Sequence, residues 1–500
     1  MAPSRQTMTM LALGGVPAII IFIFRLLQAI KVSRKRKDLE EKAHKRRNES
    51  MQQIEKVVAL SKEGSNDEPG DAVTNIAYKD LKEKLETGQL AAYDVVNAYR
   101  RKAASLHKEL NCLTGFIEGA LEQAKTLDSL RTSGQLKGVL HGIPVSVKET
   151  ILLKGYDSTA GIAKRCGILS EEDSVAIAAI KEAGGVPFCR TNIPQTNLSY
   201  GCRRISRRGS FSVLPGQTGV AASFGPMAKE VDTIAAAMSA LVTYSNKYDT
   251  FVAPIPWSWD TYNASSKLRI GYYVADGFIA STPGEFAPAP TSQSYREAAC
   301  ARAVREACHA MRARGHQIIP FKPPHAIKVF ELLQNETVDG SLRAFVEGVR
   351  VSGSFWTGKL LPKALRRQGK KRVADLLESQ GICSTDELWK AQIFNFLDFP
   401  AGTVPVGTAN TEDELAMEDW PHNTLKEQFG DDLQRMIDSN LVYGEQHDAV
   451  EAIVRSNCQG IVGLPTAVQC VTLPWKEELC LRAMREIQSA LGKNVPTPCL

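Results

Sequence analysis

Apolar residues recur at a helical period over Ala77 to Leu113 and again over Leu121 to Leu130. Two short apolar runs, Val139 to Val147 and Val186 to Cys189, predict strands, and Val175 to Ala183 between them predicts a helix. Because strand and helix signals alternate, the pattern indicates an α/β fold, a twisted mixed β-sheet core flanked by helices.

The N-terminal pattern is different, since Met8 to Ile30 is apolar almost throughout. Its strictly apolar part, Met10 to Phe24, is shorter than the roughly 20 residues that span a bilayer, but Arg25 can reach the interface and let the helix continue. A cleaved signal peptide is the alternative. The strongest charge follows the apolar run, at Lys31 to Arg47, and no A-x-A-like site follows Phe24, so we expect a retained anchor with the rest of the chain in the cytosol.

The pattern divides the chain into three parts. Residues 1–30 are the expected membrane anchor, residues 31–71 a basic juxtamembrane helix and linker, and residues 72–500 one large domain. Within the second part, Asp38 to Leu60 has helical spacing, and Ser61 to Asp71 is polar and glycine-containing, which is typical of a linker.

Composition narrows the class of protein. Hydrophobic residues make up 43% and charged residues 23%, the balance of a globular protein. The net charge is +6 and much of it lies in the basic run behind the apolar segment, which favours a membrane over a nucleic acid as partner. The eleven cysteines form no C-x-x-C pair, and the eight histidines lie singly, so we expect a reducing compartment and no metal site.

Five segments carry a resemblance to a known family. They are LHGIPVSVKE at Leu140 to Glu149, TNIPQ at Thr191 to Gln195, FGPMA at Phe224 to Ala228, LDFPAGTVPV at Leu397 to Val406, and GLPTAVQCVTLPWKEELCLRAMRE at Gly463 to Glu486. In this order they resemble the amidase signature family, and the last two look like animal fatty acid amide hydrolase. The resemblance implies hydrolysis of fatty acid primary amides and N-acylethanolamines to fatty acid and amine, with no cofactor.

Lys148 is the candidate catalytic residue. The resemblance implies that it deprotonates a bridging serine, which activates a second, nucleophilic serine. The residues agree, because Lys148 follows the apolar Val145 and Val147, and a desolvated lysine has a lowered pKa and can act as a general base. The alternative from the residues alone is a surface ion pair between Lys148 and Glu149.

The chain departs from the family after Tyr200. The Gly/Ser-rich stretch that should carry both serines and the oxyanion loop is absent, and Cys202 runs directly into Arg203. A second gap falls near 392/393. We therefore expect an incomplete fold and no activity; a lipid- or partner-binding pseudoenzyme and a poorly folding truncated product are the alternatives.

The arginine-rich sequence RRISRR follows the first gap. We expect Ser206 and Ser210 to lie there in a solvated loop and not to replace the nucleophile. The sequence around Ser206 also resembles a basophilic phosphorylation site.

The lipid-facing residues are expected from the resemblance. Asn197 and Leu198 match the family's acyl-channel positions. The family's membrane cap corresponds to an amphipathic basic helix, whose apolar anchors are Phe355, Trp356, Leu360, Leu361 and Leu365. An ordinary amphipathic surface helix is the alternative. We expect a lipid amide ligand and an intracellular membrane, such as the endoplasmic reticulum; a homodimer is left open.

Overall fold

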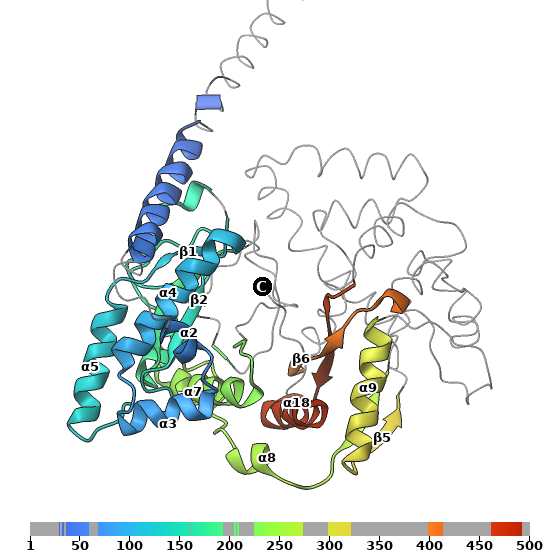
Figure 1. Cartoon of the computed structure of the whole chain (residues 1–500). Coiled ribbons are helices and arrows are strands. Elements are labelled where there is room, and N and C mark those ends of the chain that lie inside the picture. The colour runs from blue at the N-terminus through green and yellow to red at the C-terminus, as the bar shows by residue number, and fades with distance from the viewer. Residues whose placement is uncertain are drawn as a thin grey trace, which may run out of the picture.

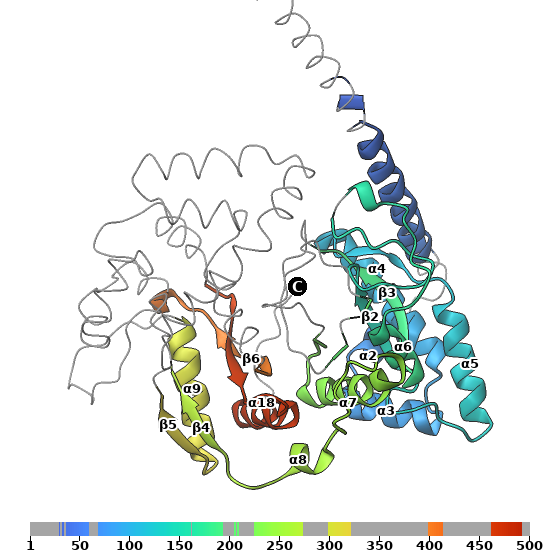
Figure 2. The same ribbon diagram turned by 180° about the vertical axis from the view of Figure 1, so that it is seen from behind.

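In the computed structural model the elements form two groups, and helix α7 packs in the hydrophobic cores of both (Figures 1 and 2). The structure describes residues 30, 33–34, 37–59, 69–161, 163–193, 205–206, 208–209, 225–273, 299–321, 399–413 and 462–492.

The N-terminal group is built around a three-stranded sheet with strand order β1-β3-β2. Strand β3 pairs with β2 in parallel and with β1 in antiparallel, so this sheet is mixed. Its elements are the N-terminal helix (residues 37–59), α2 (Pro69–Thr74), α3 (Tyr78–Thr87), α4 (Ala92–Leu110), β1 (Leu113–Phe116), α5 (Ala120–Thr132), β2 (Pro144–Lys148), η1 (Ala163–Arg165), α6 (Val175–Glu182) and β3 (Val186–Thr191).

The C-terminal group contains two strand pairs in its described ranges. Strands β4 and β5 are parallel, and β6 and β7 are antiparallel. The elements are α7 (Val231–Tyr248), α8 (Trp259–Asn263), β4 (Arg269–Tyr272), α9 (Ala299–Ala313), β5 (Gln317–Pro320), β6 (Ala401–Thr408), β7 (Pro465–Val471) and α18 (Glu477–Leu491).

Helix α7 belongs to two hydrophobic cores. Ala236 and Ala240 pack in the core of the N-terminal group. Met238 and Leu241 pack in the core that α7 forms with α6, α9, β6, β7 and α18. Since α7 is apolar over much of its length, it can bury one face against each group.

The patterns predicted most elements of the N-terminal group, with corrections at their ends. The helices at Leu121 to Leu130 and Val175 to Ala183 are confirmed as α5 and α6. The run Ala77 to Leu113 is not one helix, because it is interrupted at Gly88. Gly88 has φ of 79°, a left-handed conformation that ends α3, and a Cβ there would meet the guanidinium of Arg131.

Two further boundaries are corrected. Strand β2 begins only at Pro144, because the residues before it form a turn that buries Leu140. The polar segment expected as a linker ends earlier than predicted, since α2 already begins at Pro69. The C-terminal signature segments do pair: Val404 of β6 lies opposite Val468 of β7.

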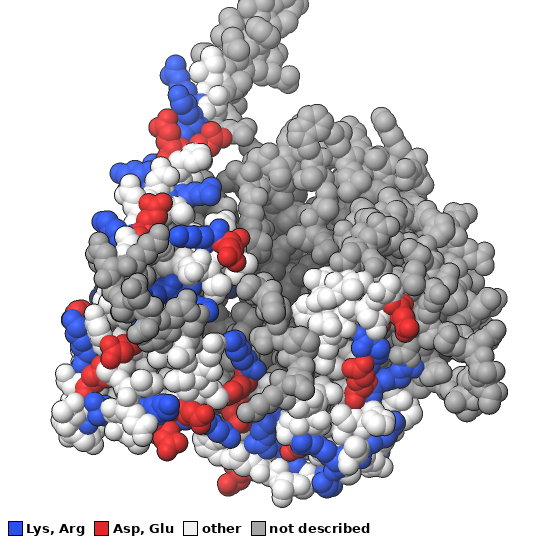
Figure 3. Space-filling model, in the orientation of Figure 1, with Lys and Arg blue, Asp and Glu red and all other residues white. Residues whose placement is uncertain are grey.

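The helix expected over Asp38 to Leu60 is present, and it packs on the N-terminal group. Ile54 and Val57 of this helix are buried in the first core. On the face in Figure 3, basic and acidic side chains are interspersed along the helix. Over the ranges that the structure describes, no helix combines the length and the apolar character needed to cross a bilayer. Residues 1–29 lie outside those ranges, so the anchor remains a prediction.

Candidate active site

Lys148 is the last residue of β2. It lies opposite Thr191 in the parallel pairing of β2 with β3, and the backbone N–H of Glu149 donates to the Thr191 carbonyl at 3.1 Å. The first two signature segments, one ending at Glu149 and one beginning at Thr191, are therefore held side by side by strand pairing.

The surroundings of Lys148 are partly apolar. Its neighbour Val147 is buried with Ile117, Leu153 and Ile177 on the face of β2 that meets α6. Lys148 itself is half-buried, and burial lowers the pKa of its ammonium group. A lowered pKa increases the fraction of neutral amine near neutral pH, which is the property a general base requires.

Glu149 is not the surface residue that the ion-pair alternative required. Its side chain is 1% exposed, and its carboxylate accepts the backbone N–H groups of Thr159 at 2.5 Å and Ala160 at 3.1 Å. Ala160 has φ of 50°, a left-handed conformation that is uncommon for a residue other than glycine. A surface pair between Lys148 and Glu149 is therefore excluded.

An ionic cluster surrounds this loop. Arg46 of the N-terminal helix donates two hydrogen bonds to Asp157, at 2.7 and 2.8 Å, and lies 3.5 Å from the Glu149 carboxylate. Arg190 of β3 lies 3.8 Å from Glu149 and 3.6 Å from Asp157, and it donates to the carbonyl oxygens of both residues.

The cluster changes the pKa of its members. Burial alone would raise the pKa of Asp157, but the hydrogen bonds from Arg46 and the Gly167 N–H outweigh burial and lower it. The pKa of Arg190 is lowered by its burial, against the pull of the two carboxylates. Sequence reasoning missed the cluster, because Arg46 lies 111 residues from Asp157 and resembles the other basic residues of its run.

The segment after the first gap is built into the protein. Ile205 and Ser206 are 1% and 2% exposed, and the Ser206 hydroxyl donates to the Asp249 carboxylate at 2.5 Å. The Arg208 N–H in turn donates to the Ser206 oxygen at 3.1 Å. The expectation that Ser206 lies in a solvated loop is therefore wrong. The arginines around Ser206 indicate an exposed segment, but the apolar Ile205 beside it is buried in the second core.

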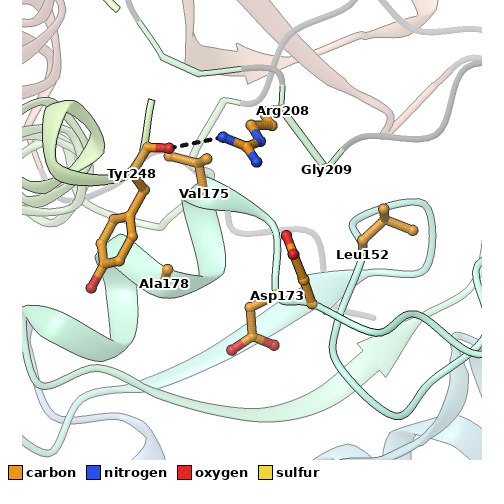
Figure 4. Close-up of a pocket in the computed structure, with 8 residues that line it drawn as sticks. Leu152, Asp173, Val175, Ala178, Arg208, Gly209 and Tyr248 are labelled. Atoms are coloured by element: carbon orange, nitrogen blue, oxygen red, sulfur yellow. Dashed lines mark hydrogen bonds between the residues drawn. The ribbon is translucent and has the colours of Figure 1, made fainter. Parts of the chain in front are cut away.

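A cavity of about 380 Å³ lies under the same segment (Figure 4). Arg208 crosses it and donates to the Tyr248 carbonyl at 3.3 Å. Asp173 at its edge is already bound by the Lys181 ammonium at 2.7 Å and by the Lys154 N–H at 2.9 Å. The lining is completed by Leu152, Glu172, Val175, Ala178 and Gly209.

Other candidate residues cannot be placed. Asn197, Leu198 and the cap residues Phe355, Trp356, Leu360, Leu361 and Leu365 lie outside the described ranges, as do both sides of the second gap at 392/393. Within the described ranges, no group of three or more His, Cys, Asp or Glu side chains could hold a metal.

A comparison with known proteins shows the family to which the chain belongs. The Amidase family matches residues 94–206 and 202–344, half of the chain. The chain therefore belongs to the amidase family. Among its relatives are fatty acid amide hydrolases. It is 27% identical to fatty-acid amide hydrolase 1 of Sus scrofa, over 90% of this chain and 92% of the pig protein.

Further relatives support the same fold. The chain is 25% identical to fatty acid amide hydrolase 1 of Caenorhabditis elegans, over 84% of this chain and 89% of the nematode protein. A solved fatty acid amide hydrolase superposes with a TM-score of 0.67 at 18% identity, covering 90% of this chain and 95% of that chain. The structural likeness establishes the amidase-type α/β fold.

Proposed function

We propose that this chain is a membrane-bound protein of the fatty acid amide hydrolase type that retains the lysine of the catalytic apparatus and lacks the serines. One observation carries the proposal. Lys148 sits at the end of β2 opposite Thr191, and no Gly/Ser-rich stretch follows Tyr200.

The alignments support an internal loss. The alignments with the pig and nematode proteins run over 578 and 547 positions, more than the 500 residues of this chain, so residues of those proteins stand opposite gaps. The two matches to the Amidase family meet at residues 202–206, where the sequence departs from the pattern.

Ser206 is a poor surrogate nucleophile. Its hydroxyl is buried and already donates to Asp249, so a substrate carbonyl could not approach it without unfolding the segment. Lys148 alone cannot form an acyl-enzyme, because acyl transfer needs a nucleophile to attack the carbonyl and N–H donors to stabilise the oxyanion. The chain is therefore expected to bind lipid amides without hydrolysing them.

A non-catalytic lipid-binding protein is favoured over a poorly folding product. The described ranges contain two hydrophobic cores joined by α7, and the segment after the first gap is seated in one of them. In this proposal residues 1–30 anchor the chain in an intracellular membrane, such as the endoplasmic reticulum. Asn197 and Leu198 contact the acyl chain, and the cap residues near Phe355 contact the bilayer.

The test uses the full-length protein in detergent, with oleamide and anandamide as substrates and released fatty acid as the readout. We expect turnover at the background rate and no covalent adduct with a fluorophosphonate probe. The control is Lys148→Ala, which should behave identically. Turnover that disappears in Lys148→Ala would contradict the proposal and require a surrogate serine.

A second measurement separates the two inactive alternatives. A lipid-binding pseudoenzyme should unfold cooperatively on heating and should bind a fluorescent fatty acyl amide at one saturable site. A chain that shows no cooperative transition would support the poorly folding alternative.

A further inference from the structure

The N-terminal helix covers the outer edge of the sheet that carries Lys148. Strand β1 is the end strand of the order β1-β3-β2, so among the described residues one side of its backbone has no strand partner. The helix supplies partners there: the side-chain amide oxygen Oε1 of Gln53 accepts the Phe116 N–H at 3.0 Å, and the Ser50 hydroxyl donates to the Thr114 backbone carbonyl. Covering an edge in this way stabilises it.

Arg46 extends the contact from the strand edge to the loop after Lys148. Its guanidinium bridges two carboxylates, with two hydrogen bonds to Asp157 and a 3.5 Å approach to Glu149. Glu149 in turn holds the turn at Thr159 and Ala160. In Figure 1 the C-terminal end of this helix reaches the level of β1. One side chain of the membrane-proximal helix therefore ties together both ends of the loop.

The cluster is balanced in charge as long as Arg46 is present. Arg46 and Arg190 face Glu149 and Asp157. The other titratable groups beside them are Cys166, and Tyr156, on whose ring Arg190 stacks. Burial raises the pKa of both groups, which keeps them uncharged near neutral pH. Without Arg46, two buried carboxylates would face one guanidinium, which favours entry of water or protons.

We propose that Arg46 is a positioning residue for Lys148: through Asp157 and Glu149 it fixes the loop that follows β2 and keeps the end of that strand partly dry. The membrane-proximal helix is then a structural part of the lysine site, and not a spacer between the anchor and the domain. The inference rests on the proposed role of Lys148 as the retained family base.

The test measures the pH dependence of Lys148 acylation in the full-length protein, using a water-soluble N-hydroxysuccinimide ester and peptide mass spectrometry. In the unsubstituted chain we expect a midpoint below the value of about 10.4 for an exposed lysine. In Arg46→Met the midpoint should rise by about one pH unit, because an uncompensated carboxylate and added water both favour the ammonium form. Arg46→Lys should give a smaller rise.

The matched control is Lys45→Met on the same helix. The Lys45 side chain is 80% exposed, and its ion pair with Glu49 is long, at 4.0 Å. It should leave the midpoint unchanged. A folded Arg46→Met protein with an unchanged midpoint would overturn the inference. A normal lysine midpoint in the unsubstituted chain would instead overturn the proposed role of Lys148, whatever Arg46 does.

A second variant covers the case in which Arg46→Met does not fold. In Arg46→Met/Asp157→Asn, one guanidinium and one carboxylate remain, so the charges balance while the tie to the helix is lost. We expect this protein to fold and its Lys148 midpoint to be raised. A midpoint equal to that of the unsubstituted chain would show that the tie does not position Lys148.

Discussion

The region that carries Lys148 and the region that carries the C-terminal signature segments hold their strands differently. In the first, β1, β2 and β3 form one sheet whose outer edge is covered by the N-terminal helix. In the second, within the described ranges, β4–β5 and β6–β7 are separate pairs held by α9 and α18. Each region has its own core, but among the described residues only the first joins three strands in one sheet, whereas the strand pairs of the second pack against helices.

The difference agrees with the places where the sequence departs from the family. The first gap expected from the sequence, at 202/203, would lie between the two regions, and the second, near 392/393, would lie shortly before β6, which begins at Ala401. Both losses would therefore fall on the second region or on its boundary, and the lysine side would be spared. Under the proposed function, Lys148 and the strands around it would then keep their arrangement although the nucleophile is absent.

The largest effect is expected from restoring the segments that the sequence lacks relative to the family. We expect a family-type Gly/Ser-rich segment inserted between Cys202 and Arg203 to be insufficient alone, because the second gap removes support for the strands of the second region. Restoring both segments should raise amide hydrolysis by up to the order of 10⁶, the cost of losing a nucleophile in a comparable serine system.

The readouts are fatty acid release and a fluorophosphonate adduct on the reinstated serine. The two single restorations serve as controls and should stay at background. Full activity from the first restoration alone would show that the second gap is a harmless loop difference and that the second region is not weakened.

A smaller effect is expected where the two regions meet. Ile205 is 1% exposed in the core shared by α6, α7, α9 and α18. Ile205→Ala should lower the free energy of unfolding by about 3 kcal/mol, through lost burial and the cavity left behind. Chemical denaturation of the full-length protein measures this.

The control for Ile205 is the same substitution at Ile168, which is 56% exposed and should change stability by less than about 1 kcal/mol. Equal effects at the two positions would show that the segment after the first gap is not an integral part of the core. The boundary between the two regions would then lie elsewhere in the chain.

Features with a local sequence pattern could be predicted, whereas contacts between distant residues could not. It predicted α5, α6 and the strands that meet at Lys148 and Thr191, because their apolar patterns are local. It missed the contact of Arg46 with Asp157, which spans 111 residues, because one arginine of a basic run carries no local sign of burial.

The segment after the first gap shows the same limit. The arginines around Ser206 predict a solvated loop, yet its hydrogen-bond partner Asp249 lies 43 residues away in the sequence, at the end of α7. Charge density describes the average environment of a segment, and a single apolar neighbour such as Ile205 decides which residues turn inward. The lipid-contacting residues remain predictions, since the described ranges do not include them.

The smallest expected effect tests whether the first region is held by its own contacts. Asp128 of α5 accepts the N–H groups of Ala92 at 2.7 Å and Tyr93 at 3.0 Å, and so caps the first turn of α4 from a neighbouring helix. Helix α4 has no side-chain cap of its own, because Ala91 precedes it. Asp128→Ala should therefore lower the free energy of unfolding by about 1–2 kcal/mol, the usual cost of losing an N-terminal cap.

The control, Glu122→Ala, removes a largely exposed carboxylate from the same helix, paired with Lys125 at 3.0 Å, and should have little effect on stability. Hydrogen exchange of the α4 amides locates the change: faster exchange in α4 with unchanged exchange in α18 would confirm that the first region is stabilised independently. Faster exchange in both helices to the same extent would mean that the two regions unfold as one unit, and the contrast between them would be one of architecture alone.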